Sequence, residues 1–229
     1  IQLLAKTRLD AIIKFWEFAE KNNLEKIAYS LSLKSLNTIN PSEEFSIYGP
    51  HIAKAYIFNK DFKTAKNWLI FSENSLGEID SLKQFYSTNL LFNLSNFDKN
   101  SSFVDILFDH IIYHKNNDSN YEDLNKNEFL YLIFSSYDND KTDIFDINKK
   151  IIEKKSMPAL YILDLINTSI REDNQIQLLL SVLVSLNGKQ WNELHPEHFR
   201  LIFFLLKNYK NGSILNKILL EILKDNKII

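Results

Sequence analysis

Two pairs of histidines stand at spacings that could support chemistry. His110 and His114 are four residues apart on one expected helix, where two imidazoles leave the same face and can share a metal ion. The residue after His110 is Ile111, not the glutamate of a metalloprotease helix, and the neighbouring Phe108 and Ile112 are typical of a core. We therefore predict surface or partly packed histidines here, and no metal site.

The second pair belongs to the segment His195-Pro196-Glu197-His198. A proline in a first helical turn, with His195 near the N-cap and Glu197 at the positive end of the helix dipole, predicts a helix start. If the chain were an enzyme, an imidazole base with Arg200 as an anion clamp would be the first candidate active site. Because a helix start explains the segment, we predict no catalytic residue and keep His195, His198 and Arg200 as candidate partner-binding residues.

Three further patterns of chemical interest have simpler explanations. The segment Asp138–Asp143 alternates oxygen-bearing side chains like a calcium loop, but Asp143 replaces the required glycine and Lys149 the final glutamate. We expect an Asx-rich turn there. The basic run Lys149–Lys155 predicts a solvated helix face. With no cysteine and no Gly-x-Ser-x-Gly elbow, the chain lacks a thiol nucleophile and that type of serine site, and we predict no cofactor.

The charge balance argues against nucleic acid as a partner. The 229 residues include 27 Lys plus Arg and 29 Asp plus Glu, so no field of one sign covers the chain. The arginines are only Arg8, Arg171 and Arg200, far apart in sequence. No run of 18 apolar residues is present, so we predict no membrane insertion. We expect a soluble chain, cytoplasmic or periplasmic, since the absence of cysteine leaves the compartment open.

The scarcity of glycine and proline points to an all-α fold. Four of each among 229 residues is far below the average usage of about 7% and 5%. A β-sandwich or barrel would be short of turn residues, and a dinucleotide-binding or P-loop fold would lack its glycines. Long helices joined by Asn, Asp and Ser remain.

Apolar residues recur at three- and four-residue spacing along the whole chain, which predicts about twelve amphipathic helices. Ser42 is the expected N-cap of a short helix carrying Phe45, Ile47 and Tyr48, and Pro50 precedes the next one. The polar stretch Lys115–Lys126 is the expected mobile segment. The other helices are expected over Gln2–Lys21, Leu24–Leu36, His51–Asn59, Phe62–Asn74, Ile79–Leu94, Ser101–His114, Glu128–Ser136, Ile144–Lys154, Pro158–Ile170, Gln175–Leu186, Pro196–Tyr209 and Ser213–Lys224.

One part of the chain resembles the tetratricopeptide repeat, most clearly over residues 47–79. The matching positions of helix A, the inter-helix turn and helix B are Ile52, Ala53, Tyr56, Phe62, Ala65 and Leu69. The segment departs from the family where Gly49 replaces a bulky aromatic, Lys60 the turn glycine and Gly77 a terminal proline. The resemblance implies antiparallel helical hairpins stacked in a right-handed superhelix, with no particular partner.

We therefore expect a single helical-repeat domain over residues 1–229, with a possible subdivision into 1–115 and 126–229. Because the chain begins at Ile1 and its one methionine is Met157, we expect it to be part of a longer protein. The predicted function is a non-enzymatic scaffold that binds a peptide or protein partner, with self-association possible. The alternative is a helical accessory domain of a larger enzyme or envelope protein. The expected groove is the helix A face with His51, Lys54, Tyr56 and Tyr161.

Overall fold

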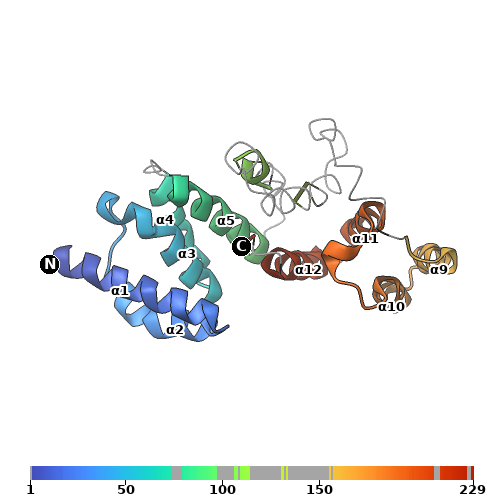
Figure 1. Ribbon diagram of the computed structural model, residues 1–229, viewed down its shortest axis with the longest axis horizontal. Helices are drawn as coiled ribbons and strands as arrows, with labels where there is room; N and C mark the ends of the chain where they lie inside the picture. Colours follow the sequence, from blue (N-terminus) through green and yellow to red (C-terminus); the bar gives the residue numbers. More distant parts are fainter. Residues whose placement is uncertain are drawn as a thin grey trace. The chain divides into compact units, whose positions relative to one another are not determined.

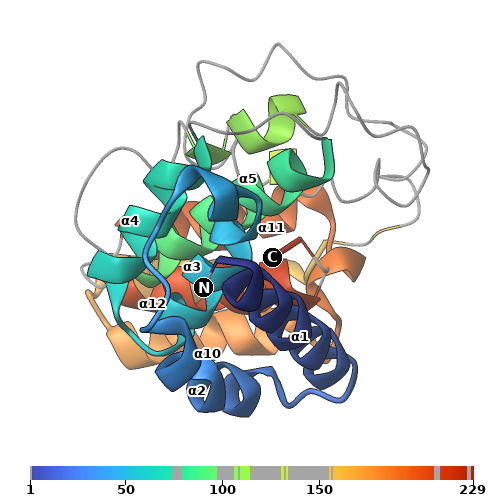
Figure 2. The same ribbon diagram turned by 90° about the vertical axis from the view of Figure 1, so that its left-hand side faces the viewer.

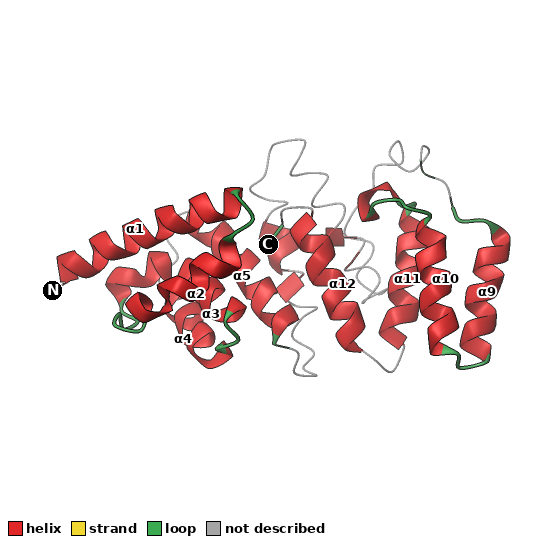
Figure 3. Ribbon diagram, turned by 90° about the horizontal axis from the view of Figure 1, so that it is seen from below, coloured by secondary structure: helices red, strands yellow, loops and turns green. Residues whose placement is uncertain are grey.

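The structure is a computed structural model that describes residues 2–73, 79–96, 106–107, 109–113, 130–131, 133, 155, 157–208, 212–225 and 228–229. These residues form helices, turns and loops, and none of them lies in a strand (Figure 3). The all-α prediction is confirmed for this part of the chain. The chain divides into two compact units, Ile1–Asn116 with Leu219–Ile229 (unit 1) and Asn117–Ile218 (unit 2). Each unit is described by itself.

The N-terminal part of unit 1 consists of helices that follow one another along the chain (Figure 1). Its helices are α1 (Gln2–Lys21), α2 (Glu25–Leu36), the 3-10 helix η1 (Glu43–Tyr48), α3 (Gly49–Phe58), α4 (Phe62–Glu73) and α5 (Ile79–Ser95). The predicted bounds of these helices are met within two residues. The short helix after Ser42 is a 3-10 helix that runs into α3, and the Ser42 side chain makes no capping hydrogen bond.

The helix α1 packs beside α2 and buries one narrow face (Figure 2). Leu9, Trp16 and Ala19 are buried on that face, at spacings of seven and three residues. Leu4 and Phe15 also stand at apolar spacing on α1, but Leu4 is 75% exposed and Phe15 is also in contact with solvent. Apolar spacing alone therefore does not show which residues of α1 are buried.

The helices α3 and α4 approach each other closely because small residues line their contact. Ala53 on α3 and Ala65 on α4 are fully buried. Gly49 is also buried, and a Cβ placed on it would lie 1.9 Å from the Ser72 hydroxyl oxygen and 3.0 Å from the Trp68 carbonyl oxygen. A side chain at Gly49 would therefore clash with α4 unless the two helices shift.

The residues Leu219–Ile229 belong to unit 1, and they include the C-terminal half of α12 (Gly212–Asp225). The Lys224 ammonium donates a 2.6 Å hydrogen bond to the Glu25 carboxylate at the start of α2. This contact and the hydrogen bonds to Glu25 outweigh the effect of burial, so the pKa of Glu25 lies below its usual value. The partly buried Leu220 and Ile229 pack against the core of the unit.

Unit 2 contains α9 (Leu160–Arg171), α10 (Gln175–Leu186), the 3-10 helix η3 (Trp191–Glu193), α11 (Pro196–Asn208) and the first half of α12. Phe199 stacks on Phe203 with ring centroids 4.3 Å apart, and Trp191 meets Phe199 edge-on at 6.2 Å. Pro196 opens its helix as predicted. Pro158 does not, because Ala159 keeps an extended backbone and α9 begins at Leu160.

Three helix pairs, α1–α2, α3–α4 and α9–α10, are joined by turns of the same geometry. The second turn residue has a left-handed backbone in each case, with φ of 56° at Asn23, 62° at Lys60 and 50° at Asp173. The third residue donates its amide five residues back, from Leu24 to Ala19, Asp61 to Tyr56 and Asn174 to Ser169. These are Schellman-type helix ends, which satisfy the last carbonyls of each first helix.

Several predictions fall outside the described residues. They concern the stretch 115–126 that we expected to be mobile, the turn expected at 138–143, the helix expected over 144–154 and all of the basic run except Lys155. The helices expected over 101–114 and 128–136 are described only in short pieces. The stacking of hairpins into one superhelix stays a prediction. In the described ranges, no helix is long and apolar enough to cross a bilayer.

Candidate functional site

A polar cluster joins α1, α2 and α3 in unit 1. It consists of Glu20, Tyr29, His51 and Lys54, and we call it the Glu20 cluster. The Tyr29 hydroxyl donates a 2.6 Å hydrogen bond to Oε1 of Glu20, and Nζ of Lys54 donates to the same oxygen at 3.0 Å. Lys54 is 34 positions from Glu20 in sequence, so the fold alone brings the two charges together.

Aromatic packing fixes the position of Tyr29. Its ring is buried, meets Trp16 edge-on at 5.1 Å and stacks on Phe58 at 5.1 Å between centroids. Trp16 is itself held, because its indole N–H donates to the Ser32 hydroxyl at 3.0 Å. The Tyr29 hydroxyl therefore reaches Glu20 from a rigid support.

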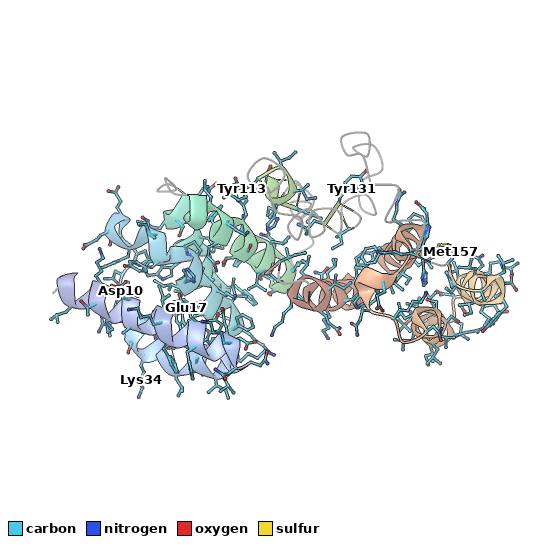
Figure 4. All side chains as sticks on the ribbon, in the orientation of Figure 1. Asp10, Glu17, Lys34, Tyr113, Tyr131 and Met157 are labelled. Atoms are coloured by element: carbon cyan, nitrogen blue, oxygen red, sulfur yellow. The ribbon has the colours of Figure 1, made fainter. Side chains whose placement is uncertain are left out.

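The cluster has one charged pair and two neutral groups at neutral pH. Burial raises the pKa of Glu20, but the Lys54 ammonium and the Tyr29 hydroxyl outweigh it, so the pKa lies below its usual value. Burial, with the nearby Glu20, raises the pKa of Tyr29. Burial and Lys54 lower the pKa of His51 against the opposite pull of Glu20 and Glu17. The ion pair between Lys54 and the half-exposed Glu20 contributes to the lowered pKa of the carboxyl, and none of these three shifts moves a pKa toward neutral pH. Asp10 and Glu17, which are labelled in Figure 4, lie on α1, the helix that also carries Glu20.

A small cleft of about 210 Å³ lies beside Lys54. The Thr88 hydroxyl at its edge is buried and has no hydrogen-bond partner. The Ser87 hydroxyl, also in the lining, lies 3.5 Å from Nε2 of His110. The full lining is Lys54, Lys83, Gln84, Ser87, Thr88, Leu91, Ile228 and Ile229.

His110 is buried, and not at the surface or partly packed as predicted, with its Nε2 beside the Ser87 hydroxyl, whereas His114 lies outside the described residues. Within the described residues, no three His, Cys, Asp or Glu side chains are grouped so that they could hold a metal ion.

The histidine segment of unit 2 is a helix start. Nδ1 of His195 accepts a hydrogen bond from the Glu197 amide at 3.2 Å. The His195 carbonyl oxygen accepts one from the Phe199 amide at 3.0 Å, as in an N-cap. Arg200 lies 3.3 Å from the Glu197 carboxylate one turn away. His195, Glu197 and Arg200 thus all take part in contacts at the start of α11.

His198 lies in the interior of unit 2. Nε2 of His198 lies 2.9 Å from the Ser185 hydroxyl, which donates at 2.6 Å to the Val182 carbonyl oxygen. The hydroxyl therefore accepts from Nε2–H of His198. Burial lowers the pKa of His198, and the nearby Lys189 and His195 add to the effect. A buried, neutral His198 and an N-capping His195 do not form an acid–base pair.

The most unusual surface of the described residues lies on α10. Its twelve residues include no charged side chain. One face is buried through Leu178, Ser181 and Val182. The opposite face carries Ile176, Leu180, Leu183 and Val184, which are 73%, 55%, 62% and 54% exposed and which we call the α10 stripe.

A groove of about 430 Å³ runs between α9 and α10, along one side of the α10 stripe. Its lining is mainly apolar and includes residues of both helices. The lining residues are Ile162, Leu165, Asn174, Ile176, Gln177, Leu180, Ser181 and Val184.

The predicted partner-binding residues fall into two groups. His51 and Lys54 meet at the Glu20 cluster, whereas Tyr56 is buried and donates to Oδ1 of Asn37 at 2.7 Å. Tyr161 is exposed on α9 of unit 2, the unit that also holds His195, His198 and Arg200.

Sequence reasoning missed both Glu20 with Tyr29 and the α10 stripe. The signal for the stripe is visible in the sequence as twelve helical residues without a charge. The signal for Glu20 is not, because an acidic residue on an amphipathic helix is ordinary.

Comparisons with models of protein families, with curated proteins and with solved structures find no match to this chain. Its function is therefore argued from its own surfaces and charges.

Proposed function

We propose that this chain is a non-enzymatic helical-repeat scaffold, and that the α10 stripe with the adjoining groove binds a protein or peptide partner. The observation that carries the proposal is a helix without charged residues, one face of which is buried while the opposite, apolar face is exposed. Such helices normally lie inside a protein or an interface, because water solvates an apolar face poorly.

The groove offers what an amphipathic helix needs from its binding site. Ile162 is buried between the helices, while Leu165, Leu180 and Val184 are exposed around it. Helix-in-groove recognition places apolar anchors at a spacing of three or four residues into such a lining. Burial of apolar surface contributes about 25 cal/mol per Å², so a few anchors provide the affinity.

The repeat part of the proposal is supported by unit 1. Residues 47–79 resemble a tetratricopeptide repeat, and α3 and α4 are held together by small residues at Gly49, Ala53 and Ala65. The same turn geometry closes the pairs α1–α2 and α9–α10. Equivalent hairpins are the building unit of helical-repeat scaffolds, whose extended surfaces bind peptides.

The polar groups favour a scaffold over an enzyme. In the Glu20 cluster, the carboxylate is occupied by Tyr29 and Lys54. In unit 2, His198 is buried against Ser185, and His195 caps a helix. These groups are engaged in internal contacts, which is the expected state of structural residues.

The test is selection of amphipathic helical peptides from a displayed library against the full chain, followed by titration of the selected peptides. We expect micromolar binding that weakens at least tenfold in Leu180→Glu. Leu31→Glu is the matched control, because Leu31 is 70% exposed on α2 of the other unit. Equal weakening by both variants would contradict the proposal.

A further inference from the structure

We propose that the occupant of the α10 stripe is a second copy of this chain, with the two α10 helices packed antiparallel about a two-fold axis at Leu180. The inference rests on the proposed function, because it names the partner of the same face. It concerns unit 2 alone.

The stripe is self-complementary in shape and polarity. Ile176 and Val184 lie four residues before and after Leu180, so an antiparallel partner centred on Leu180 places Ile176 of one copy against Val184 of the other. The contacts along this line, Leu180 with Leu180 and Ile176 with Val184, join aliphatic side chains. A helix without charges offers no feature that would select a charged ligand. Its apolar face is complementary to the same face of a second copy.

The charges at the two ends of α10 select the antiparallel orientation. Glu172 and Asp173 stand in the turn before α10, and Lys189 stands after it. Arg171 lies at the end of α9 and donates at 3.2 Å to the Thr168 hydroxyl of its own helix. With Arg171 counted, the segment Arg171–Asp173 carries a net charge of −1, and an antiparallel pair brings it near Lys189 of the other copy, whereas a parallel pair brings like charges together.

The helix dipoles also favour the antiparallel pair, because it sets the positive end of each α10 beside the negative end of the other. Both effects favour the two-fold pair.

The surface continues onto α9 through Leu165, which is exposed and lines the groove between α9 and α10. Stable protein interfaces bury roughly 800 Å² on each partner, more than one helix seam supplies. A two-fold arrangement doubles each of these contacts, since every residue is used on both copies.

The absence of cysteine makes a direct geometric test possible. Single variants Leu180→Cys, Ile176→Cys, Val184→Cys and, as control, Leu31→Cys are made in the full chain and oxidised. The antiparallel pair predicts a covalent dimer for Leu180→Cys alone, because a disulfide needs Cα atoms within about 7 Å. Ile176→Cys and Val184→Cys should cross-link only when the two variants are mixed.

Light scattering and sedimentation measure the association without cross-links. We expect a concentration-dependent dimer whose dissociation constant rises at least tenfold in Leu180→Glu and is unchanged in Leu31→Glu. Glu172→Lys and Lys189→Glu should each weaken the dimer two- to fivefold at low salt, and the double variant should restore it.

Three results would overturn part or all of this inference. Cross-linking of Ile176→Cys by itself would show a parallel pair and overturn the orientation. A monomer whose Leu180→Cys thiol reacts rapidly with maleimide would overturn the inference and leave the proposed function standing, since the face is then open to another partner. A monomer whose thiol is protected until unfolding would overturn both, because the face is then covered within the chain.

Discussion

The Tyr29 hydroxyl donates a 2.6 Å hydrogen bond to the Glu20 carboxylate, which links α2 to the end of α1. Lys54 of α3 donates to the same oxygen at 3.0 Å, so three helices of unit 1 meet at one carboxylate. The tyrosine ring is buried between Trp16 and Phe58, and its hydrogen bond to the half-exposed Glu20 is therefore partly shielded from water. Hydrogen bonds to a charged group in such surroundings are among the stronger ones.

Tyr29→Phe should destabilise unit 1 by about 1.5–3 kcal/mol, because it removes a hydrogen bond to a charged acceptor while it keeps the ring. Urea unfolding followed by tryptophan fluorescence measures the change. Tyr48→Phe is the matched control. The Tyr48 hydroxyl also donates to a carboxylate, that of Asp10 at 2.7 Å, but in contact with solvent, so we expect a smaller loss. Equal losses in the two variants would contradict the role of burial.

Gly49→Ala should destabilise unit 1 by about 1–3 kcal/mol through overpacking, since the new methyl group meets the Ser72 hydroxyl and the Trp68 carbonyl. Ser72→Ala removes the closer of these atoms. The double variant should therefore lose less stability than the sum of the single variants. A double-mutant cycle by denaturant unfolding tests this coupling, and strict additivity would show that α3 and α4 move apart freely.

Lys60→Gly should raise the stability of unit 1 by about 0.5–1 kcal/mol. Lys60 is exposed and has a φ of 62°, a left-handed conformation that costs a residue with a Cβ about 1–2 kcal/mol. Glycine removes this strain but adds freedom to the unfolded chain, which reduces the net gain. Lys60→Val should lower the stability, because a β-branched side chain tolerates this backbone poorly. Thermal unfolding should therefore show a higher melting temperature for Lys60→Gly and a lower one for Lys60→Val. A shift in the same direction for both variants would contradict the prediction.

The stability of unit 2 should fall below about pH 6.5, the ordinary pKa of histidine. Burial lowers the pKa of His198, so the unfolded chain binds a proton at a pH where the folded unit does not. Protonation then favours unfolding as the pH falls from 6.5 toward the lowered pKa, and above 6.5 the contribution is fully present.

His198→Gln keeps a donor toward Ser185 but does not titrate, so it should show a smaller decrease over this range. Fluorescence of Trp191, the sole tryptophan between residues 117 and 218, follows unit 2. Comparison at about pH 8, where His198 is neutral in both states, separates lost packing from the pH effect. An equal decrease in the variant would rule out His198 as its source.

Most helix bounds of the described residues could be predicted because their signals are local. The bounds of α1 and α10 agree with the prediction to the residue, since Asn22-Asn23 and Asn174 stand at their ends and apolar residues recur at helical spacing. The start of α9 was displaced by two residues, because the backbone of Ala159 stays extended after Pro158. A proline indicates that a helix begins nearby, but the first helical residue depends on backbone angles that the pattern does not specify.

The candidate sites could be predicted only in part. His51 and Lys54 were identified from their place on an expected helix face, but their partner Glu20 was not, since it lies on another helix. Tyr56 was expected on a binding surface and is instead buried against Asn37. Which side of a helix faces a neighbour depends on the packing of several helices at once.

The sequence by itself determined that this chain is helical, where most of its described helices begin and end, and that α10 carries no charge. These properties follow from local spacing and residue type, which act within one or two turns. Only the tertiary structure decided which equally apolar residues are covered, so that Ile52 is buried and Leu180 is exposed. It also brought Glu20, Tyr29 and Lys54 to one point. Burial and ion pairing depend on neighbours distant in sequence, and a periodic pattern does not specify those neighbours.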